Sequence, residues 1–171
     1  MVPEKRFRTT VEVSVRSLDG RRGPARRLLV EAVRRAAATL GPGRYIVEVA
    51  YAGDAVMRRL NRRFHGSGGT TDVLAFPSFI DTPEGLVVGE VVVNRDAARR
   101  ASQEGGGVMR EMLRYVVHGV LHLAGFDDGN QAARRRMWME QEQVLQSLFE
   151  KRGARKMWSH DRQLVSGKER G

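Results

Sequence analysis

Four stretches of the chain have the hydrophobic pattern of β-strands. In the first, valines alternate with polar residues, which is the period of a strand with one buried face. The others are short, rich in β-branched or aromatic residues, and bounded by turn-forming residues. We expect Pro77 to end the third strand, and turn residues at 81–85 to make the third and fourth strands a hairpin. The predicted strands are residues 10–16, 45–51, 72–76 and 86–93.

Five stretches have apolar residues at helical spacing. Asp54 and Asn94 each precede such a stretch and are suited to cap a helix N-terminus, while Gly41 and Gly125 are suited to end one. Strands and helices alternate irregularly, which predicts an α+β (mixed α/β) fold with one small sheet of about four strands and about five helices. The predicted helices are residues 24–40, 54–64, 94–102, 108–124 and 130–151.

The chain of 171 residues is the size of one domain. The hydrophobic pattern ends near Lys151, so we expect a single domain at 1–151 and a basic tail at 152–171. Cysteine is absent, which excludes thiolate metal sites and agrees with a reducing compartment. No apolar run approaches the ~20 residues of a membrane span, and residues 1–8 lack a signal-peptide core. We expect a cytoplasmic protein without a membrane partner.

Charge indicates a polyanionic partner. The chain has 30 basic and 20 acidic residues and a net charge of +10, nearly all of the basic residues being arginine. The net charge is +6 over residues 1–50, −1 over 51–128 and +5 over 129–171. Arginine suits phosphate and base contacts because its planar guanidinium binds bidentately and stacks. The alternative is that a G+C-rich genome has placed arginine on ordinary solvated faces.

The stretch from His118 to Asp128 has the pattern of a metal site, with the sequence H-G-V-L-H-L-A-G-F-D-D. His118 and His122 are four residues apart, so both imidazoles can reach one ion from one helical face. Gly125 permits a sharp turn that can bring Asp128 back as a third ligand. Three protein ligands leave a fourth position open, which is typical of catalytic zinc sites. We expect one Zn²⁺ per chain.

This motif leaves alternatives open. Histidines four residues apart also occur by chance as hydrogen-bonded core residues, and Asp127 competes with Asp128 for the ligand position, or caps the turn instead. The spacing parallels H-E-x-x-H-x-x-G-x-x-H of metzincin proteases, so we expect a metzincin-like site at the end of a central helix. Gly119 stands where those proteases carry their glutamate base, which disfavours a protease.

With these residues in view, the chain resembles the YbeY family of bacterial rRNA maturation factors. Residues 118–127 match the family motif H-G-x-L-H-L-x-G-[YF]-D-H up to its last histidine. Residues 60–64 and 71–77 are similar to its L-N-x-x-[YF]-R and T-D-V-L-S-F-P blocks, and residues 89–93 to its G-D-I-V-I strand. The resemblance spans about residues 45–145.

The resemblance implies a zinc-dependent, single-strand-specific endoribonuclease that acts in small-subunit rRNA 3′-end maturation and ribosome quality control. It implies rRNA and the small ribosomal subunit as partners, with other ribosome-associated proteins as candidates, and leaves the oligomeric state open. The family binds its metal with three histidines and has an arginine after the aromatic residue of the earlier block. By position, the ligands here are His118, His122 and Asp128, and His65 takes the arginine's place.

Both departures from the family pattern fall on functional positions. Asp128 is a suitable zinc ligand, but a carboxylate shifts metal preference toward harder ions. His65 lacks the bidentate fork of arginine, so phosphate stabilisation would weaken unless Arg62 or Arg63 replaces it. His65 is instead suited to act as a general base, or it is a loop residue without a role.

We expect metal-assisted cleavage of an RNA phosphodiester, with His118 and His65 as catalytic residues. The sequence does not distinguish a water nucleophile from the RNA 2′-hydroxyl. A second hypothesis is a non-catalytic ribosome- or RNA-binding assembly factor with a structural metal, and a third is a metalloprotease. The residues expected to hold the RNA backbone are Arg58, Arg59, Arg62 and Arg63.

Overall fold

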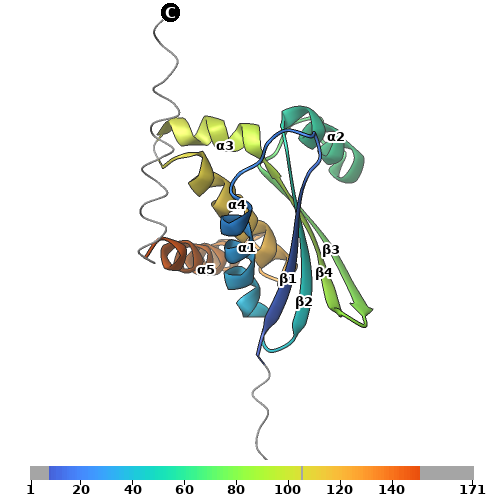
Figure 1. Cartoon of the computed structure of the whole chain (residues 1–171). Helices are drawn as coiled ribbons and strands as arrows, with labels where there is room; N and C mark the ends of the chain where they lie inside the picture. Colours follow the sequence, from blue (N-terminus) through green and yellow to red (C-terminus); the bar gives the residue numbers. More distant parts are fainter. Residues whose placement is uncertain (1–7, 105, 151–171) are drawn as a thin grey trace, which may run out of the picture.

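One four-stranded mixed sheet organises the molecule (Figure 1). The computed structural model describes residues 8–104 and 106–150, so the predicted tail at 152–171 and its boundary lie outside the described residues. The strands are β1 (Thr10–Ser17), β2 (Arg44–Ala52), β3 (Val73–Thr82) and β4 (Gly85–Asn94). Their order is β1-β2-β4-β3, with β1–β2 and β2–β4 parallel and β3–β4 antiparallel. The expected α+β class and four-stranded sheet are confirmed.

In the described residues five α-helices accompany the sheet, as expected. They are α1 (Arg26–Ala36), α2 (Asp54–His65), α3 (Arg95–Ala101), α4 (Val108–Leu123) and α5 (Gln131–Glu150), with 3₁₀ segments η1 (Ala37–Leu40) and η2 (Ser102–Glu104). The helix predicted over 24–40 is thus α1 followed by a 3₁₀ turn, and it stops at Gly41, whose φ is +86°. Within the described residues, no helix combines the length and apolarity needed to cross a membrane.

Successive side chains of a strand point in opposite directions, and the sheet contributes to one core on each face, although the outer face of β1 is exposed. On β2, Val47 and Val49 belong to the large core shared with α1, α4 and α5. Ala50 and Ala52 belong to a smaller core that includes Met57 of α2. Figure 1 shows the corresponding layers, with α1, α4 and α5 on one side of the sheet and α2 on the other. The sheet is therefore a scaffold between a basic helix and a buried central helix.

Close packing of α4 on the sheet depends on Gly119. A Cβ atom at this position would overlap Cγ1 of Val91 on β4 and lie 3.1 Å from Cγ2 of Val73 on β3. The missing side chain lets the helix backbone approach the strands, which fixes the height of its neighbour His118 above them. Gly119 thus has a packing role in addition to marking the absence of a glutamate.

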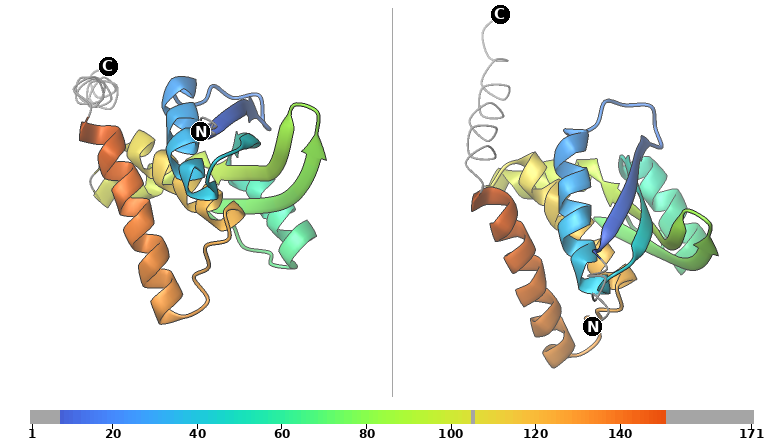
Figure 2. Two further views of the ribbon diagram at one scale, coloured as in Figure 1. Left: turned by 90° about the horizontal axis from the view of Figure 1, so that it is seen from below. Right: turned by 60° about the horizontal axis from the view of Figure 1, so that its bottom comes forward.

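Strand β3 differs from its prediction, because it continues through Pro77 to Thr82. Proline has no N–H to donate, but β3 is an edge strand, where an absent donor on the open side costs no ladder hydrogen bond. The pairing with β4 shifts register between Pro77 and Ile80, and Phe79 within this bulge has a φ of +52°. Figure 2 shows the resulting long β3–β4 hairpin projecting from the rest of the sheet.

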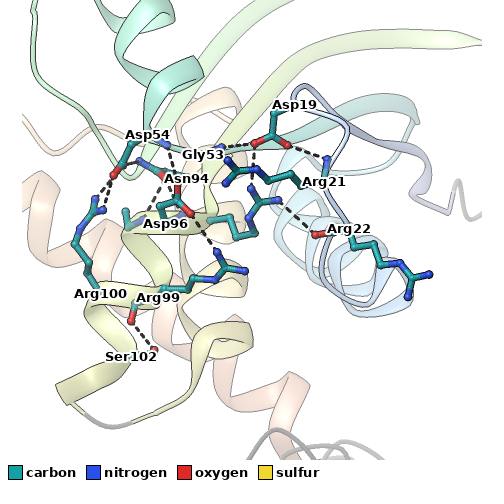
Figure 3. A network of polar contacts seen from close by, with 12 residues as sticks. Asp19, Arg21, Arg22, Gly53, Asp54, Asn94, Asp96, Arg99, Arg100 and Ser102 are labelled. Atoms are coloured by element: carbon teal, nitrogen blue, oxygen red, sulfur yellow. Dashed lines mark hydrogen bonds and ion pairs between the residues drawn. The ribbon is translucent and has the colours of Figure 1, made fainter. Parts of the chain in front are cut away.

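Asp54 does not cap α2 as predicted. Gly53 is the N-cap residue and has no side chain to cap the helix, so the carboxylate of Asp96 accepts from the backbone N–H of Asp54 (3.0 Å). The Asp54 carboxylate instead accepts hydrogen bonds from Arg100 (Nη2, 3.0 Å) and from the side-chain amide of Asn94 (2.8 Å), as Figure 3 shows. Asn94 does cap α3 as predicted, since its Oδ1 accepts from the backbone N–H groups of Asp96 and Ala97.

Asp19 extends this network to a third strand end. Its carboxylate accepts from the backbone N–H of Gly53 (3.0 Å) and of Arg21 (3.2 Å), and pairs with the buried guanidinium of Arg95 (3.0 Å). The residues that follow β1, β2 and β4 are therefore tied together at the carboxyl edge of the parallel strands (Figure 3). The described polar groups mostly satisfy one another here, which indicates a structural role.

Candidate metal centre

His118 and His122 lie on one face of α4, as their spacing predicts. Their Nε2 atoms are 3.1 Å apart and their rings meet edge to face. In a tetrahedral site with zinc–nitrogen bonds of 2.0–2.1 Å, two ligand nitrogens are about 3.3 Å apart. The two imidazoles therefore already have the separation that a shared ion requires.

The outer nitrogen of each imidazole has a hydrogen-bond acceptor. His122 Nδ1 lies 3.1 Å from the carbonyl oxygen of Phe126, and His118 Nδ1 lies 3.1 Å from Oε1 of Gln141. A carbonyl oxygen can only accept, so Nδ1 of His122 donates and its Nε2 carries the lone pair. Metal-binding histidines are held in this way by a partner at the second nitrogen. Both Nε2 lone pairs thus face the same point, an arrangement that a cation stabilises.

The end of α4 returns the chain toward these histidines. The N–H of Phe126 donates to the carbonyl of Leu121 (3.0 Å) and the N–H of Gly125 donates to that of His122 (3.0 Å), the two bonds of a Schellman turn. Gly125 has a φ of +90°, as this turn requires. The predicted role of Gly125 is confirmed.

Asp128 follows this turn and joins the histidines. One ligand atom from each of His118, His122 and Asp128 lies within 4.8 Å of the others, the one such group among the described residues. Asp127 caps the loop instead, because its Oδ1 accepts from the backbone N–H of Asp128 (2.8 Å) and of Gly129 (3.1 Å). Between the two adjacent aspartates, the geometry therefore favours Asp128 as the ligand.

The electrostatics of the site favour the metal-binding form of His118. Burial lowers the pKa of His118 and the neighbouring His122 lowers it further, while the hydrogen bond with Gln141 and the negative charges of Asp128 and Asp72 raise it in part. The net pKa lies below the usual histidine value, so the imidazole is neutral at pH 7. A neutral imidazole is the form that binds metal. Two nitrogens and one carboxylate oxygen form a donor set that fits Zn²⁺.

Gln141 belongs to the site but was not predicted from the sequence. It is buried in α5, where its amide oxygen meets His118. The available signal was a polar residue on the apolar face formed by Met137, Val144 and Leu148, a position that requires a polar partner.

His65 is the last residue of α2 and is exposed. It is not part of the metal-binding group, and among the described residues no hydrogen bond or ion pair holds its imidazole. The structure thus does not bring His65 together with His118. Its catalytic role stays a prediction.

The four predicted RNA-binding arginines are all exposed on α2. None of them forms an ion pair with an acidic residue in the described part of the chain, so their charge is available to a ligand. Asn61, buried between them, donates to the carbonyl of Gly69 (2.9 Å) and holds the glycine-rich loop at residues 65–70 against the helix. The arginines are Arg58, Arg59, Arg62 and Arg63.

Comparison with known proteins gives a consistent result. The family model described as Endoribonuclease YbeY matches residues 12–149. A protein named Endoribonuclease YbeY from Anaeromyxobacter sp. (strain Fw109-5) is 43% identical over 117 residues, which cover 68% of this chain and 60% of that protein. One of the same name from Chlorobium phaeovibrioides is 38% identical over 122 residues, covering 70% and 80%.

The fold is also found among solved structures. The solution structure of TM1509 from Thermotoga maritima is similar with a TM-score of 0.58 at 21% sequence identity, covering 94% of this chain and all of that one. The family model and the solved structure thus both match the chain over nearly the whole of the sheet and its helices. From the first residues of β1 to the end of α5, this chain belongs to the YbeY endoribonuclease family.

Proposed function

We propose that the chain is a metal-dependent endoribonuclease of rRNA processing, with Zn²⁺ as its ion. The observation that carries the proposal is the pair His118 and His122, whose Nε2 lone pairs converge 3.1 Å apart while both Nδ1 atoms are held by acceptors. The names of the relatives support cleavage of RNA as the activity. These histidines and Asp128 would hold the divalent ion, which would supply Lewis-acid chemistry at a phosphodiester.

The arginines of α2 hold the RNA backbone in this proposal. Their guanidinium groups are exposed and free of ion pairs with described residues, as phosphate binding requires. His65, at the end of the same helix, is free to donate to a phosphate oxygen or to take a proton as a general base. A His65→Arg variant separates these roles, because arginine keeps the phosphate contact and cannot act as a base.

The proposal extends to the setting in which the enzyme works. Its substrate is single-stranded rRNA at the 3′ end of the small-subunit precursor, and its partners are the small ribosomal subunit and proteins bound to it. It acts in the cytoplasm, where it also takes part in ribosome quality control. The sequence motifs shared with the family and the net charge of +10 support this setting.

A second candidate is a non-catalytic assembly factor whose metal is structural. Asp128 and His65 favour it, since both stand at functional positions where the family motif has another residue. A metalloprotease is disfavoured by packing, because Gly119 lies against Val91 with no room for the side chain of a glutamate base.

The test compares cleavage of a small-subunit rRNA precursor by the purified protein and by His118→Ala, with Glu84→Gln in the exposed β3–β4 turn as control. Wild type and the control should cleave equally, and the histidine variant should lose most activity. Chelation should abolish cleavage while circular dichroism stays native. Equal cleavage by all three proteins would refute the nuclease, and loss of fold on chelation would favour the structural metal.

A further inference from the structure

A tryptophan on α5 lies exposed beside the metal centre. Trp138 is 57% exposed, although tryptophan is among the side chains that gain most from burial. Burying an indole stabilises a protein by a few kcal/mol, so an exposed one marks a surface for a ligand when its surroundings agree. Both the position of Trp138 on α5 and the charge around it indicate such a surface.

The position of Trp138 follows from its neighbours along α5. Arg134, four residues before it, donates from Nε (3.3 Å) and Nη2 (3.2 Å) to the carbonyl oxygen of Asp128. Gln141, three residues after it, contacts His118. Residues at i−4, i and i+3 lie on one side of a helix, about one turn apart. Trp138 is thus flanked by one α5 residue that contacts the metal-binding loop and another that contacts a metal-binding histidine.

The charge around Trp138 suits a polyanion. From Gln131 to Met139, α5 carries three arginines and no acidic residue. Arg134 binds a neutral carbonyl, Arg136 lies over the ring of Phe126 at 5.5 Å, and Arg135 is exposed. None of them forms an ion pair with a described carboxylate. Their positive charge is therefore available to phosphates that pass over the indole.

We infer that Trp138 is a stacking platform for an unpaired base of the RNA substrate, next to the phosphodiester that is cut. This inference rests on the proposed function and adds a substrate-binding residue to it. Exposed aromatic rings among arginines are the recurrent means by which proteins hold single-stranded nucleic acid, because every base has a π face. The glutamate one turn later, Glu142, is paired with Arg114 (3.1 Å), which reduces its repulsion of the backbone.

The platform accounts for a preference for single strands. A base inside a duplex is stacked on both faces and offers none to the protein, whereas a base in a single strand can place one face on the indole. With the base fixed on α5 and the adjoining backbone held by arginines, the sugar–phosphate lies over His118 and Asp128. Trp138 then sets which nucleotide stands next to the cut.

The experiment measures binding of a fluorescein-labelled single-stranded RNA by stopped-flow anisotropy, before turnover. Trp138→Ala removes the platform and places a good helix former at an exposed site, so folding is preserved. We expect about 5- to 150-fold weaker binding, the range seen for loss of one stacked base. Trp138→Phe should recover most of the affinity. Met139→Ala is the matched control, because Met139 is equally exposed, at 58%, on another side of the same helix.

Two further readouts separate stacking from loss of charge. An abasic site scanned along the RNA should weaken wild-type binding at one position and leave Trp138→Ala unaffected there. The dependence of affinity on salt should be the same in both proteins, because no phosphate contact is removed. During cleavage, KM should rise while kcat changes little.

The results distinguish failure of the proposed function from failure of the stacking platform. If wild type neither binds nor cleaves RNA, the proposed function falls and this inference with it. If wild type cleaves RNA but Trp138→Ala binds within twofold of Met139→Ala, only the stacking platform is refuted. Equal losses in Trp138→Ala and Trp138→Phe would also refute it, since an aromatic ring would then not suffice.

Discussion

His118 and His122 are oriented by two different kinds of acceptor. The carbonyl of Phe126 belongs to the backbone of the turn after α4, so it stays in place whatever side chain stands at that position. The acceptor for His118 is the side chain of Gln141, contributed by α5. One imidazole is therefore fixed by local geometry, and the other depends on a single replaceable residue.

Replacing Gln141 with leucine should weaken Zn²⁺ binding about 10- to 100-fold, the usual effect of removing the partner of a metal-binding histidine. The variant leaves the Nδ1–H of His118 without an acceptor in a buried place. Competition titration against a chromophoric chelator measures the change. Gln141→Glu keeps an acceptor and should bind at least as tightly as wild type. The control is Gln143→Leu, since Gln143 is exposed on the same helix; equal affinities in the two leucine variants would contradict the role of Gln141.

At the scale of elements, α4 and the β3–β4 pair meet without a side chain between them at Gly119. Alanine there would gain about 1 kcal/mol in helix propensity. It would also force Val91 or the helix to move, at a cost of typically 1–3 kcal/mol for overpacking. The packing effect should exceed the propensity effect.

Gly119→Ala should therefore lower the free energy of unfolding, measured by urea denaturation. Gly68→Ala is the matched control, because its nearest neighbour would be 3.9 Å from the new Cβ atom. Val91→Ala removes the methyl groups that clash. In that background, Gly119→Ala should lower the free energy of unfolding less than it does in the wild-type protein. A Gly119→Ala protein as stable as wild type would show that α4 can shift freely on the sheet.

The network at the carboxyl edge of the strands predicts acid sensitivity. Hydrogen bonds from Arg100 hold the pKa of Asp54 well below its usual value of about 3.9, against the opposing effect of burial. Burial also raises the pKa of Asp19, but the backbone N–H groups of Arg21 and Gly53, with other donors, bring it below the usual value. Both carboxylates thus bind protons more weakly in the folded state than in the unfolded state.

The contribution of these two carboxylates to stability should accordingly be constant above about pH 5 and fall as the pH drops below 4, because the unfolded chain takes up protons first. Urea midpoints between pH 7 and pH 2 measure this loss. Asp54→Asn should be less stable than wild type at pH 7 and should lose less on acidification. Asp81→Asn, at the exposed end of β3, serves as the control. Parallel pH profiles for wild type and Asp54→Asn would refute the contribution of Asp54.

Local signals predicted the elements and the grouping of the candidate ligands, and contacts between elements account for what was missed. His118, His122 and Gly125 could be placed from spacing alone, because a helix face and a Schellman turn are local features. The prediction that Pro77 ends a strand was wrong because β3 lies at the edge of the sheet, where proline is tolerated. That position is a property of the topology and cannot be inferred from the local sequence. Asp54 was expected as a cap, but Asn94 and Arg100, forty or more residues away, provide its partners. Gln141 was missed for the same reason.

At the scale of the whole molecule, charge and chemistry occupy different parts of the chain. The segment with the metal motif is near neutral, at −1 over residues 51–128, while residues 129–171 carry +5. Residues 152–171, outside the described structure, contain six basic and two acidic residues. Such charge adds sequence-independent affinity for RNA that decreases as salt increases.

Truncation after Lys151 should therefore weaken RNA binding and reduce its salt dependence more than it changes kcat. Filter binding at several salt concentrations and single-turnover cleavage measure the two effects. A full-length protein with the basic residues of 152–171 replaced by glutamine controls for chain length, and should behave like the truncation. Unchanged affinity and salt dependence in both variants would show that these residues do not contact RNA.

The contacts of α5 with the metal centre have a consequence for how the molecule opens. Gln141 orients His118, and Arg134 holds the loop that carries Asp128, so a complete site exists only while α5 is docked. Partial unfolding of this helix would release the ion, and by linkage a bound ion would oppose that opening by about 2.7 kcal/mol at a hundredfold excess over its Kd. Backbone amides of α5 would then exchange with solvent about a hundredfold more slowly in the loaded protein. The ion would thus hold α5 in its docked position, so that a shortage of metal would increase local unfolding of this helix and the exposure of the chain to proteases.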